Sequence, residues 1–235
     1  MIDTGSSPEV RLLDKADAPA AFDVHRRALA NLPDKSFMYS RDLDYFTAIA
    51  QDEGRLIGAY IGRELVGYIA VRLPGSASNT HWKSLRHLPI DPRCVSEGAG
   101  SAVLPEYRSK GLFSKLLSAR NAIALSLGAE FQTSIVAPGN LSCLLPVLAD
   151  HSLMAATYED HTGINYLLIK PLAQALEAGS RSGTIISVGD TAGNLLHLSN
   201  GEIGVPYDHN QVTYRIPGEL NQIFAGTTKA KTRWA

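Results

Sequence analysis

The chain has 235 residues, which is enough for one domain with an extension or for two small domains. Hydrophobic residues make up 45% of the chain and charged residues 19%, as is typical of a globular protein with an ample core. The 22 lysines and arginines balance 23 aspartates and glutamates, so no basic field points to DNA as a partner.

The sequence shows no sign of a membrane segment. No stretch approaches the ~20 consecutive apolar residues that cross a membrane, and the N-terminus does not resemble a signal peptide, so we expect neither an anchor nor a cleaved leader. The two cysteines, Cys94 and Cys143, lie far apart and not at a spacing typical of metal sites. A reducing, cytoplasmic setting is the simplest interpretation.

The first part of the chain predicts a strand, two helices and a hairpin. We expect a strand at 10–13, a helix that begins after Asp17 with Pro19 in its first turn, and a second helix from Asp42 to about Asp52. Residues 55–61 and 65–71 are rich in β-forming residues, and the short polar link between them predicts an antiparallel hairpin.

Residues 74–93 then interrupt the pattern and predict a long loop with one helical turn. His81 and His87 lie in this loop, but nothing nearby completes a set of metal ligands, so we expect no metal. A flap beside a substrate or a contact between subunits is the expected role of the loop.

A strand, a turn and a helix follow in direct succession. Residues 94–104 predict a buried central strand, and residues 112–127 carry apolar side chains mostly at helical spacing, with Lys115 and Arg120 off the apolar face. Such a turn presents free N–H groups and the positive end of a helix dipole to a phosphate. Arg108 and Lys110 add positive charge, and Gly111 lets an anion approach the backbone, although this combination is also common on ordinary surfaces.

The turn resembles the acyl-CoA signature of the GNAT superfamily of N-acyltransferases. In that signature Arg or Gln is followed by two residues, Gly, one residue, and Gly or Ala. The segment Arg108-Ser109-Lys110-Gly111-Leu112-Phe113 matches at Arg108 and Gly111 and departs at Phe113, where Gly or Ala is usual. The resemblance extends over about 9–172 as an order of elements. It implies an α/β (α+β) fold with a mixed, mostly antiparallel central sheet flanked by helices.

The resemblance also implies a donor substrate and its site. The donor would be acetyl-CoA or another acyl-CoA, with no metal. A main-chain N–H near Val103 or Leu104 would point at the thioester carbonyl, and the turn amides would hold the pyrophosphate. The implied donor-binding residues are Ala102, Val103, Leu104, Arg108, Ser109, Lys110, Gly111, Leu112, Phe113 and Asn140.

After Gly128, a helix C-cap, residues 130–136 predict a strand that in the family splays from the central strand and leaves a cleft for pantetheine. Asn140 is a plausible N-cap of a helix that continues to Leu148, which Pro146 should kink or break. The family pattern there is Asn-x-x-Ala-x-x-x-Tyr. Cys143 stands in place of the Ala and Val147 in place of the Tyr, which is the usual acid for the leaving thiolate.

The rest of the chain predicts a closing hairpin and a second unit. Residues 154–158 and 163–169 form the hairpin, and we divide the chain into an acyltransferase domain at 1–172 and a small β-rich C-terminal extension at 173–235. The extension should hold a short helix at 173–178, a linker at 179–183, strands at 184–188, 195–198, 203–205 and 211–216, and a helical turn at 220–224. Asn200-Gly201 is a strong hairpin signal. Four short strands are marginal alone, so we expect them to pack on the first domain or on another subunit.

Acyl transfer to an amine needs a base and benefits from an acid. Glu97 is the candidate base, because it precedes Arg108 at the distance where histone-acetylating members carry theirs. A buried carboxylate would also have its pKa raised into a useful range, whereas the alternative is a surface glutamate. Tyr158 and His151 are candidates for the missing acid, or the thiolate leaves without one. Cys143 is a conceivable nucleophile, but a small buried thiol is the simpler interpretation.

Three functions remain open at this point. The leading one is an N-acyltransferase acting on a primary amine of a small molecule or a protein, with Phe37, Tyr39, Tyr45 and Phe46 as acceptor contacts or as ordinary core aromatics. The second is a transferase of the same fold with another donor such as aminoacyl-tRNA, which the near-neutral charge disfavours. The third is a non-catalytic acyl-CoA-binding regulator. A homodimer is possible in each case.

Overall fold

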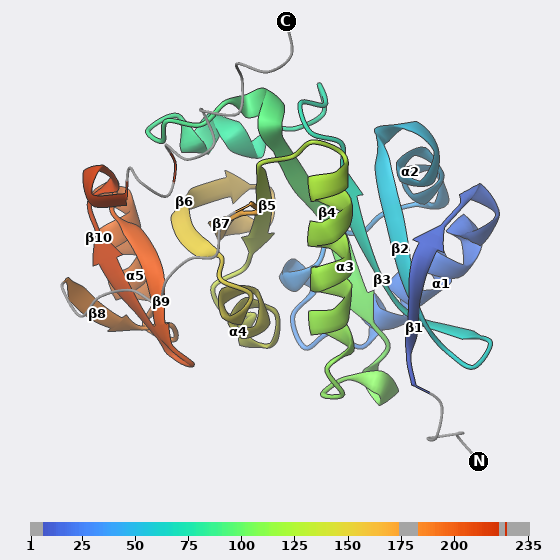
Figure 1. The fold of residues 1–235 in the computed structure, drawn as a ribbon. Coiled ribbons are helices and arrows are strands. Elements are labelled where there is room, and N and C mark those ends of the chain that lie inside the picture. The colour runs from blue at the N-terminus through green and yellow to red at the C-terminus, as the bar shows by residue number, and fades with distance from the viewer. Residues whose placement is uncertain (1–6, 174–182, 221–223, 225–235) are drawn as a thin grey trace, which may run out of the picture.

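The computed structural model describes residues 7–173, 183–220 and 224. Within these residues the strands form one ten-stranded sheet in the order β1-β2-β3-β4-β5-β7-β6-β9-β10-β8. Neighbouring strands are antiparallel except for the pair β4–β5, which is parallel. The mixed, mostly antiparallel sheet flanked by helices confirms the predicted fold class (Figure 1).

The predicted elements of the first 172 residues are present close to their expected bounds. In chain order they are β1 (Glu9–Leu13), α1 (Ala18–Ala30), α2 (Leu43–Ala48), β2 (Gly54–Ile61), β3 (Glu64–Arg72), β4 (Val95–Val103), α3 (Leu112–Ser126), β5 (Phe131–Val136), α4 (Leu141–Ala149), β6 (Leu153–Asp160) and β7 (Gly163–Pro171). The loop between β3 and β4 contains the expected short helical turn, His81–Leu85.

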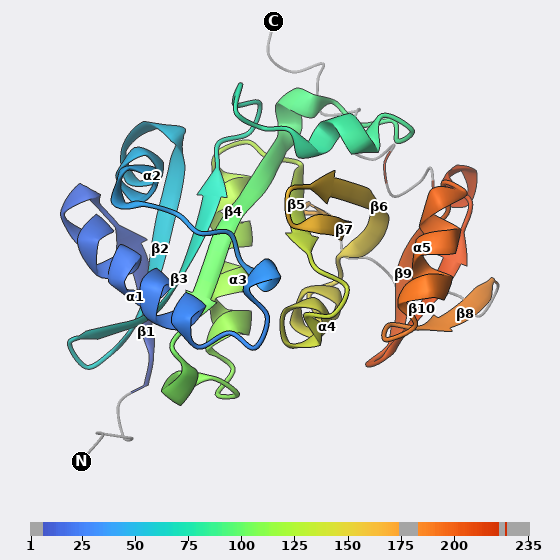
Figure 2. The same ribbon diagram turned by 180° about the vertical axis from the view of Figure 1, so that it is seen from behind.

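Helices cover the β2–β4 part of the sheet on both faces. Helix α3 lies in front of these strands in Figure 1 and packs against α4, whereas α1 lies on the opposite face, in front in Figure 2. The core between these layers holds Leu56, Ile57 and Ile69, all of them fully buried or nearly so. The core of this unit therefore lies in two layers, one on each face of the β2–β4 part of the sheet.

Pro146 does not break α4, although a break was one of the two outcomes predicted from the sequence. The helix continues through it to Ala149, with Asn140 as its N-cap. Proline removes one N–H donor, whose helical acceptor would be the carbonyl of residue 142 in the first turn. Ser142 is exposed, so water can satisfy that carbonyl.

The C-terminal segment differs from the prediction at one element. It forms β8 (Thr184–Ser187), α5 (Thr191–Ser199), β9 (Ile203–Asp208) and β10 (Gln211–Arg215). The prediction of a strand at 195–198 is therefore wrong, because these residues belong to α5. Asp190 caps α5 by accepting a hydrogen bond from the Gly193 N–H. Asn200 ends the helix and Gly201 follows with φ +76°, so this pair terminates a helix instead of turning a hairpin.

The C-terminal strands continue the main sheet. Gly204 of β9 pairs with Met154 of β6. One buried cluster joins Phe131 and Leu153 of the first unit to Ile203 and Phe224 of the second. The expected packing on the first domain is therefore present, while the division into two domains at residue 172 stays a prediction.

Three expectations fall largely outside the described residues. Most of the helix predicted at 173–178 and of the linker predicted at 179–183 lies there. A helical turn was predicted at 220–224, and only its first and last residues are described. Leu220 ends a short helical turn, Pro217–Leu220, and Phe224 is buried.

Asn194→Ala should destabilise the C-terminal segment. The fully buried Asn194 amide donates to the carbonyls of Ser187, Val188 and Asp190, and its oxygen accepts from the Tyr214 hydroxyl at 2.8 Å. The loss of these four hydrogen bonds leaves buried polar groups unpaired, so we expect a decrease of about 2–3 kcal/mol in the free energy of unfolding. Urea denaturation measures it.

Leu196→Ala is the matched control in the same helix. Leu196 is 61% exposed, so its truncation should change the free energy of unfolding by no more than about 0.5 kcal/mol. Equal effects of the two substitutions would contradict the assigned role of Asn194.

Candidate active site

Strands β4 and β5 separate after a short stretch of pairing. They are hydrogen-bonded only from Val95↔Phe131 to Glu97↔Thr133. Beyond that point β5 keeps its partner β7 on the other side, while β4 has a bulge and Gly100 adopts φ +115°. Gly98 to Ser101 are partly or fully exposed although β4 is a central strand. An opening therefore begins at Glu97 and widens along the two strands.

The main chain of β4 offers free groups to this opening. The Leu104 N–H donates to the Val66 carbonyl of β3 at 2.9 Å, so it is not available to a ligand. In an antiparallel pair alternate residues face the partner, which directs the main-chain groups of Val103 and Ser101 toward β5. Of the two predicted amides, Val103 remains a candidate. Ser101 was missed, because the sequence does not give the register of the strands.

The turn before α3 is open and donor-rich. Gly111 is the N-cap of α3 in the left-handed conformation (φ +73°), without any side-chain cap, and Ser109 also has a positive φ of +59°. A Cβ at Gly111 would meet no atom within 4 Å. Exposed N–H groups at a helix N-terminus form an anion site, so the turn fits a phosphate group.

The basic side chains of the turn are held beside it. The Arg108 Nε donates to the Val103 carbonyl at 3.0 Å, and the Lys110 Nζ donates to the Glu106 carbonyl at 3.1 Å. Leu112 is buried and Phe113 packs against the core, so these two residues can offer only their main-chain N–H groups to a ligand. The helix thus accommodates Phe113, where the family has Gly or Ala, by directing it inward.

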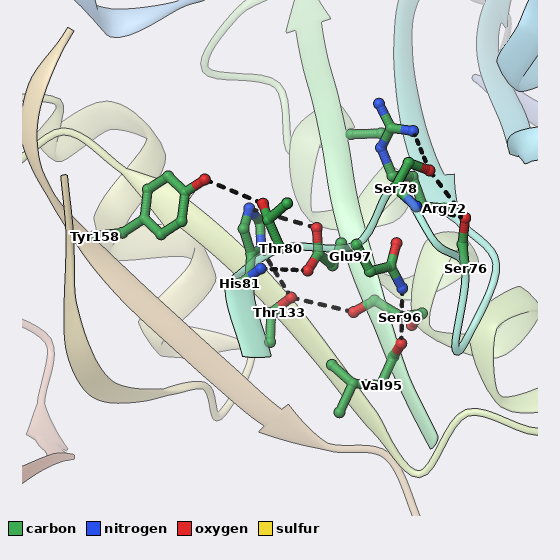
Figure 3. A network of polar contacts seen from close by, with 12 residues as sticks. Arg72, Ser76, Ser78, Thr80, His81, Val95, Ser96, Glu97, Thr133 and Tyr158 are labelled. Atoms are coloured by element: carbon green, nitrogen blue, oxygen red, sulfur yellow. Dashed lines mark hydrogen bonds and ion pairs between the residues drawn. The ribbon is translucent and has the colours of Figure 1, made fainter. Parts of the chain in front are cut away.

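Glu97 is buried at the closed end of the opening. Its side chain accepts from the His81 N–H, and the carboxylate lies 3.8 Å from the His81 Nε2 (Figure 3). It is 3% exposed, so Glu97 is not a surface residue. Burial raises the pKa of Glu97 to about 7, against the lowering effect of the His81 and Thr80 N–H groups and of the Arg72 charge.

His81 supports Glu97, a role that the sequence did not suggest. The Thr133 hydroxyl donates to the Ser96 carbonyl at 3.2 Å, so its oxygen accepts from the His81 Nδ1, 3.0 Å away. The lone pair of Nε2 therefore faces Glu97. Burial lowers the pKa of His81 to about 4, which keeps the imidazole neutral at pH 7. No signal in the sequence pairs this loop residue with β4.

Tyr158 belongs to the same network, whereas His151 does not. The Tyr158 hydroxyl lies 3.1 Å from the Thr80 Oγ1, and its ring packs edge-on to His81 at 5.1 Å. In Figure 3, Thr80 and His81 lie between Tyr158 and Glu97. His151 is exposed in the turn between α4 and β6. The structure thus brings one of the two candidate acids near the candidate base.

The predicted aromatic contacts have different positions. Phe46 is fully buried among core rings and is a core residue. The Tyr45 hydroxyl donates to the Ala99 carbonyl of β4, at the opening. Tyr39 donates to Asp160 at the end of β6, and Phe37 is half-buried near Gly139.

Three of the residues considered in the sequence, Asn140, Cys143 and Val147, belong to helix α4 and its N-cap. The Asn140 side chain accepts from the Cys143 N–H at 3.3 Å. Burial raises the pKa of the Cys143 thiol to about 11, which makes this cysteine a poor nucleophile. Val147 is buried in the core.

In the described part of the chain, no cluster of three or more His, Cys, Asp or Glu side chains could hold a metal.

The part of the chain that holds Glu97 and the turn before α3 matches a known protein family. The model of the acetyltransferase (GNAT) family matches residues 21–142, or 122 of the 235 residues. Comparison with the curated proteins gives no match. Among the helices that the structure describes, none has the length and hydropathy to cross a membrane.

Several solved structures share the fold. One is the structure of yncA from Salmonella typhimurium with its cofactor acetyl-CoA, to which this chain is 16% identical. The match covers 74% of this chain and 99% of that chain, with a TM-score of 0.55. This chain is 14% identical to the ribosomal-protein-S18-alanine N-acetyltransferase from Escherichia coli (74% and 99% covered, TM-score 0.52). It is 16% identical to the aminoglycoside acetyltransferase AAC(6')-Ib with coenzyme A (70% and 95% covered, TM-score 0.53).

Glu97→Gln should change the stability of the fold in a pH-dependent way. The pKa of this carboxyl is about 7 in the folded protein against an ordinary value of 4.5, so the folded state holds more protons between these values. The stabilisation from the neutral carboxyl is complete below pH 4.5 and is lost as the pH rises through 7. The amide of the variant stays neutral, so the variant should be more stable at about pH 8, by up to about 3 kcal/mol.

Urea denaturation at a series of pH values tests this expectation. The difference between the two proteins should shrink toward zero as the pH falls to about 4.5. Glu159 provides the control, because its side chain is exposed to solvent and Glu159→Gln should change the free energy of unfolding by no more than about 0.5 kcal/mol. A difference that does not vary with pH would contradict a buried, titrating Glu97.

Proposed function

The chain belongs to the acetyltransferase (GNAT) family, and on that premise we propose that it transfers an acetyl or other short acyl group from acyl-CoA to a primary amine by direct attack. The observation that carries the proposal is the opening between β4 and β5, with the uncapped N-terminus of α3 near its wide end and a buried carboxylate at its closed end. Acyl-CoA supplies the activated thioester, and the protein has to position it and manage the protons.

The proposed donor site uses residues from three elements. The main-chain N–H groups of the turn from Arg108 to Phe113 hold the pyrophosphate, and those of Ser101 and Val103 face the pantetheine arm and the thioester. The Asn140 amide nitrogen is a further donor at the start of α4. Main-chain donors are already fixed in place, so they cost little reorganisation during the reaction.

Glu97 is the proposed base. An amine is largely protonated at neutral pH and must be neutral to attack, so a group that accepts its proton near pH 7 is well matched. Glu97 meets this condition because its pKa is about 7, and it lies at the point where the two strands separate. His81 is a positioning residue, since it holds the carboxylate through its main-chain N–H.

The proposal also includes an acid and a class of acceptor. That Tyr158 protonates the leaving thiolate remains a prediction, supported by its contacts with Thr80 and His81, the residues next to Glu97. The structurally similar proteins include acetyltransferases of a ribosomal-protein alanine and of aminoglycosides, so we propose a small-molecule or protein amine. Tyr45 and Tyr39 are the proposed acceptor contacts. A cytoplasmic location and a homodimer also remain predictions.

Gly111→Glu should abolish donor binding. The variant adds a carboxylate where we place the pyrophosphate, so acetyl-CoA should raise the melting temperature of the wild type but not of the variant. Gly128→Glu is the matched control. Gly128 also has a positive φ (+86°) and open space around its Cβ, but it lies at the other end of α3. No thermal shift of the wild type with any acyl-CoA would exclude both the transferase and the acyl-CoA-binding regulator.

Glu97→Gln should lower kcat by about 10²–10⁴-fold while the affinity for acetyl-CoA stays nearly unchanged. The wild-type rate should rise with pH through about 7, as Glu97 loses its proton, and the variant should lack this rise. Kinetics would use the acceptor found by screening CoA release with polyamines, amino acids, aminoglycosides and peptides. An identical pH–rate profile in both proteins would remove Glu97 from the mechanism.

A further inference from the structure

Arg120 of α3 is buried at the closed end of the opening. The sequence placed it off the apolar face of its helix, but its residue exposure is only 3%. Its Nη1 donates to the Ser134 Oγ of β5 at 3.0 Å. The same atom lies 3.2 Å from the position that a Cβ on Gly98 of β4 would occupy. The guanidinium therefore spans the point where β4 and β5 begin to separate.

The charge of Arg120 is only partly balanced by its surroundings. Burial lowers the pKa of Arg120 to about 10, against the raising effect of the nearby Asp150 charge. Within residues 7–173, 183–220 and 224, Arg120 forms no ion pair at or below 4.0 Å, and its buried Nε has no hydrogen-bond partner. The neighbouring Asp150 is engaged by Lys170 at 2.7 Å and by the Asn121 amide at 2.6 Å. The Arg120 Nη2 donates to the Asn121 Oδ1 at 3.4 Å, which like the Ser134 hydroxyl is a neutral group. A buried cation that lacks an ion-pair partner is destabilising, so its presence points to a negatively charged ligand.

The other ionisable groups around Arg120 do not supply that charge. Burial raises the pKa of the Cys143 thiol of α4, so this thiol is neutral. Glu97 precedes Gly98 on β4, and successive side chains of a strand point to opposite faces. Glu97 therefore emerges on the face of His81 and Tyr158, and Arg120 approaches from the face of α3 and α4.

We propose that Arg120 stabilises the sulfur of coenzyme A as a thiolate when it leaves the tetrahedral centre. The proposal rests on the proposed function. In that reaction the amine nitrogen bonds to the thioester carbonyl carbon, Glu97 receives the amine proton, and the carbon–sulfur bond breaks with its electron pair on sulfur. Arg120 keeps its protons throughout and contributes charge and N–H donors.

The position of Arg120 favours the sulfur over the phosphates. The anion-binding turn lies at the N-terminus of α3, whereas Arg120 lies roughly 12 Å further along the helix at about 1.5 Å per residue. That places the guanidinium near the reacting end of a donor whose pyrophosphate sits in the turn. On the adjacent helix α4, Val147 stands where the family carries its acidic Tyr, so Arg120 provides charge near a site that lacks the usual acid.

The thiol pKa of bound coenzyme A tests the proposal without turnover. The thiolate absorbance of coenzyme A, with dethio-coenzyme A as the blank, is titrated free, on the wild type, and on Arg120→Met and Arg120→Lys variants. We expect the wild type to lower the thiol pKa by about one unit or more, Arg120→Met to abolish the shift, and Arg120→Lys to keep part of it. Arg63→Met, which removes an exposed charge in the β2–β3 turn, should retain the full shift.

Kinetics should agree with the titration. Arg120→Met should lower kcat by about tenfold or more, with the KM for acetyl-CoA and the affinity for dethio-coenzyme A nearly unchanged. An equal loss of affinity for coenzyme A and its dethio analogue would indicate a structural role and overturn the proposal.

Measurements on the wild type alone distinguish a failure of the Arg120 proposal from a failure of the proposed function. If it binds coenzyme A but the bound thiol titrates like the free thiol, Arg120 does not act on sulfur and this inference fails alone, even if Arg120→Met does not fold. If it binds neither coenzyme A nor the dethio analogue, the proposed function fails and this inference with it.

Discussion

The separation of β4 from β5 after the pair Glu97↔Thr133 is the constraint on which the rest of the site depends. A strand that loses its neighbour exposes main-chain groups, which need other partners. The Tyr45 hydroxyl satisfies the Ala99 carbonyl, and the Arg108 guanidinium satisfies the Val103 carbonyl. By the register of β4 on β3, the N–H groups of Ser101 and Val103 are directed away from β3, toward the opening. The interruption of the sheet therefore creates the proposed binding surface, and neighbouring side chains reduce the free-energy cost of the exposed main chain.

The closed end of the opening concentrates buried polar groups that would be destabilising without partners. Thr133 connects the Ser96 carbonyl to the His81 ring, and the His81 N–H in turn holds Glu97. Burial still outweighs these hydrogen bonds, which is why the pKa of Glu97 rises instead of falling. These hydrogen bonds fix the geometry of one carboxylate while they leave that carboxylate able to exchange a proton near neutral pH.

The sequence predicted what is encoded locally. The order of elements, the turn at Arg108–Gly111 and the N-cap Asn140 follow from short patterns, and each is present. The strand predicted at 195–198 failed because an apolar run of that length fits either period, and the decisive Asp190 cap lies outside it. His81 and Arg120 could not be found, since their partners are distant in sequence and depend on strand register. For Arg120 the helical pattern even indicated the wrong environment.

The C-terminal strands affect the candidate site through β6, the strand that carries Tyr158. Without β9, β6 would be an edge strand, with unpaired main-chain groups and freedom to shift. The pair Met154↔Gly204 and the buried cluster around Phe131 and Phe224 hold β6 in place. The same strand packs its Tyr158 ring against His81, whose main chain positions Glu97. The segment after β7 therefore stabilises one wall of the site through a single strand, although within the described residues it contributes none of the groups we assign to the chemistry.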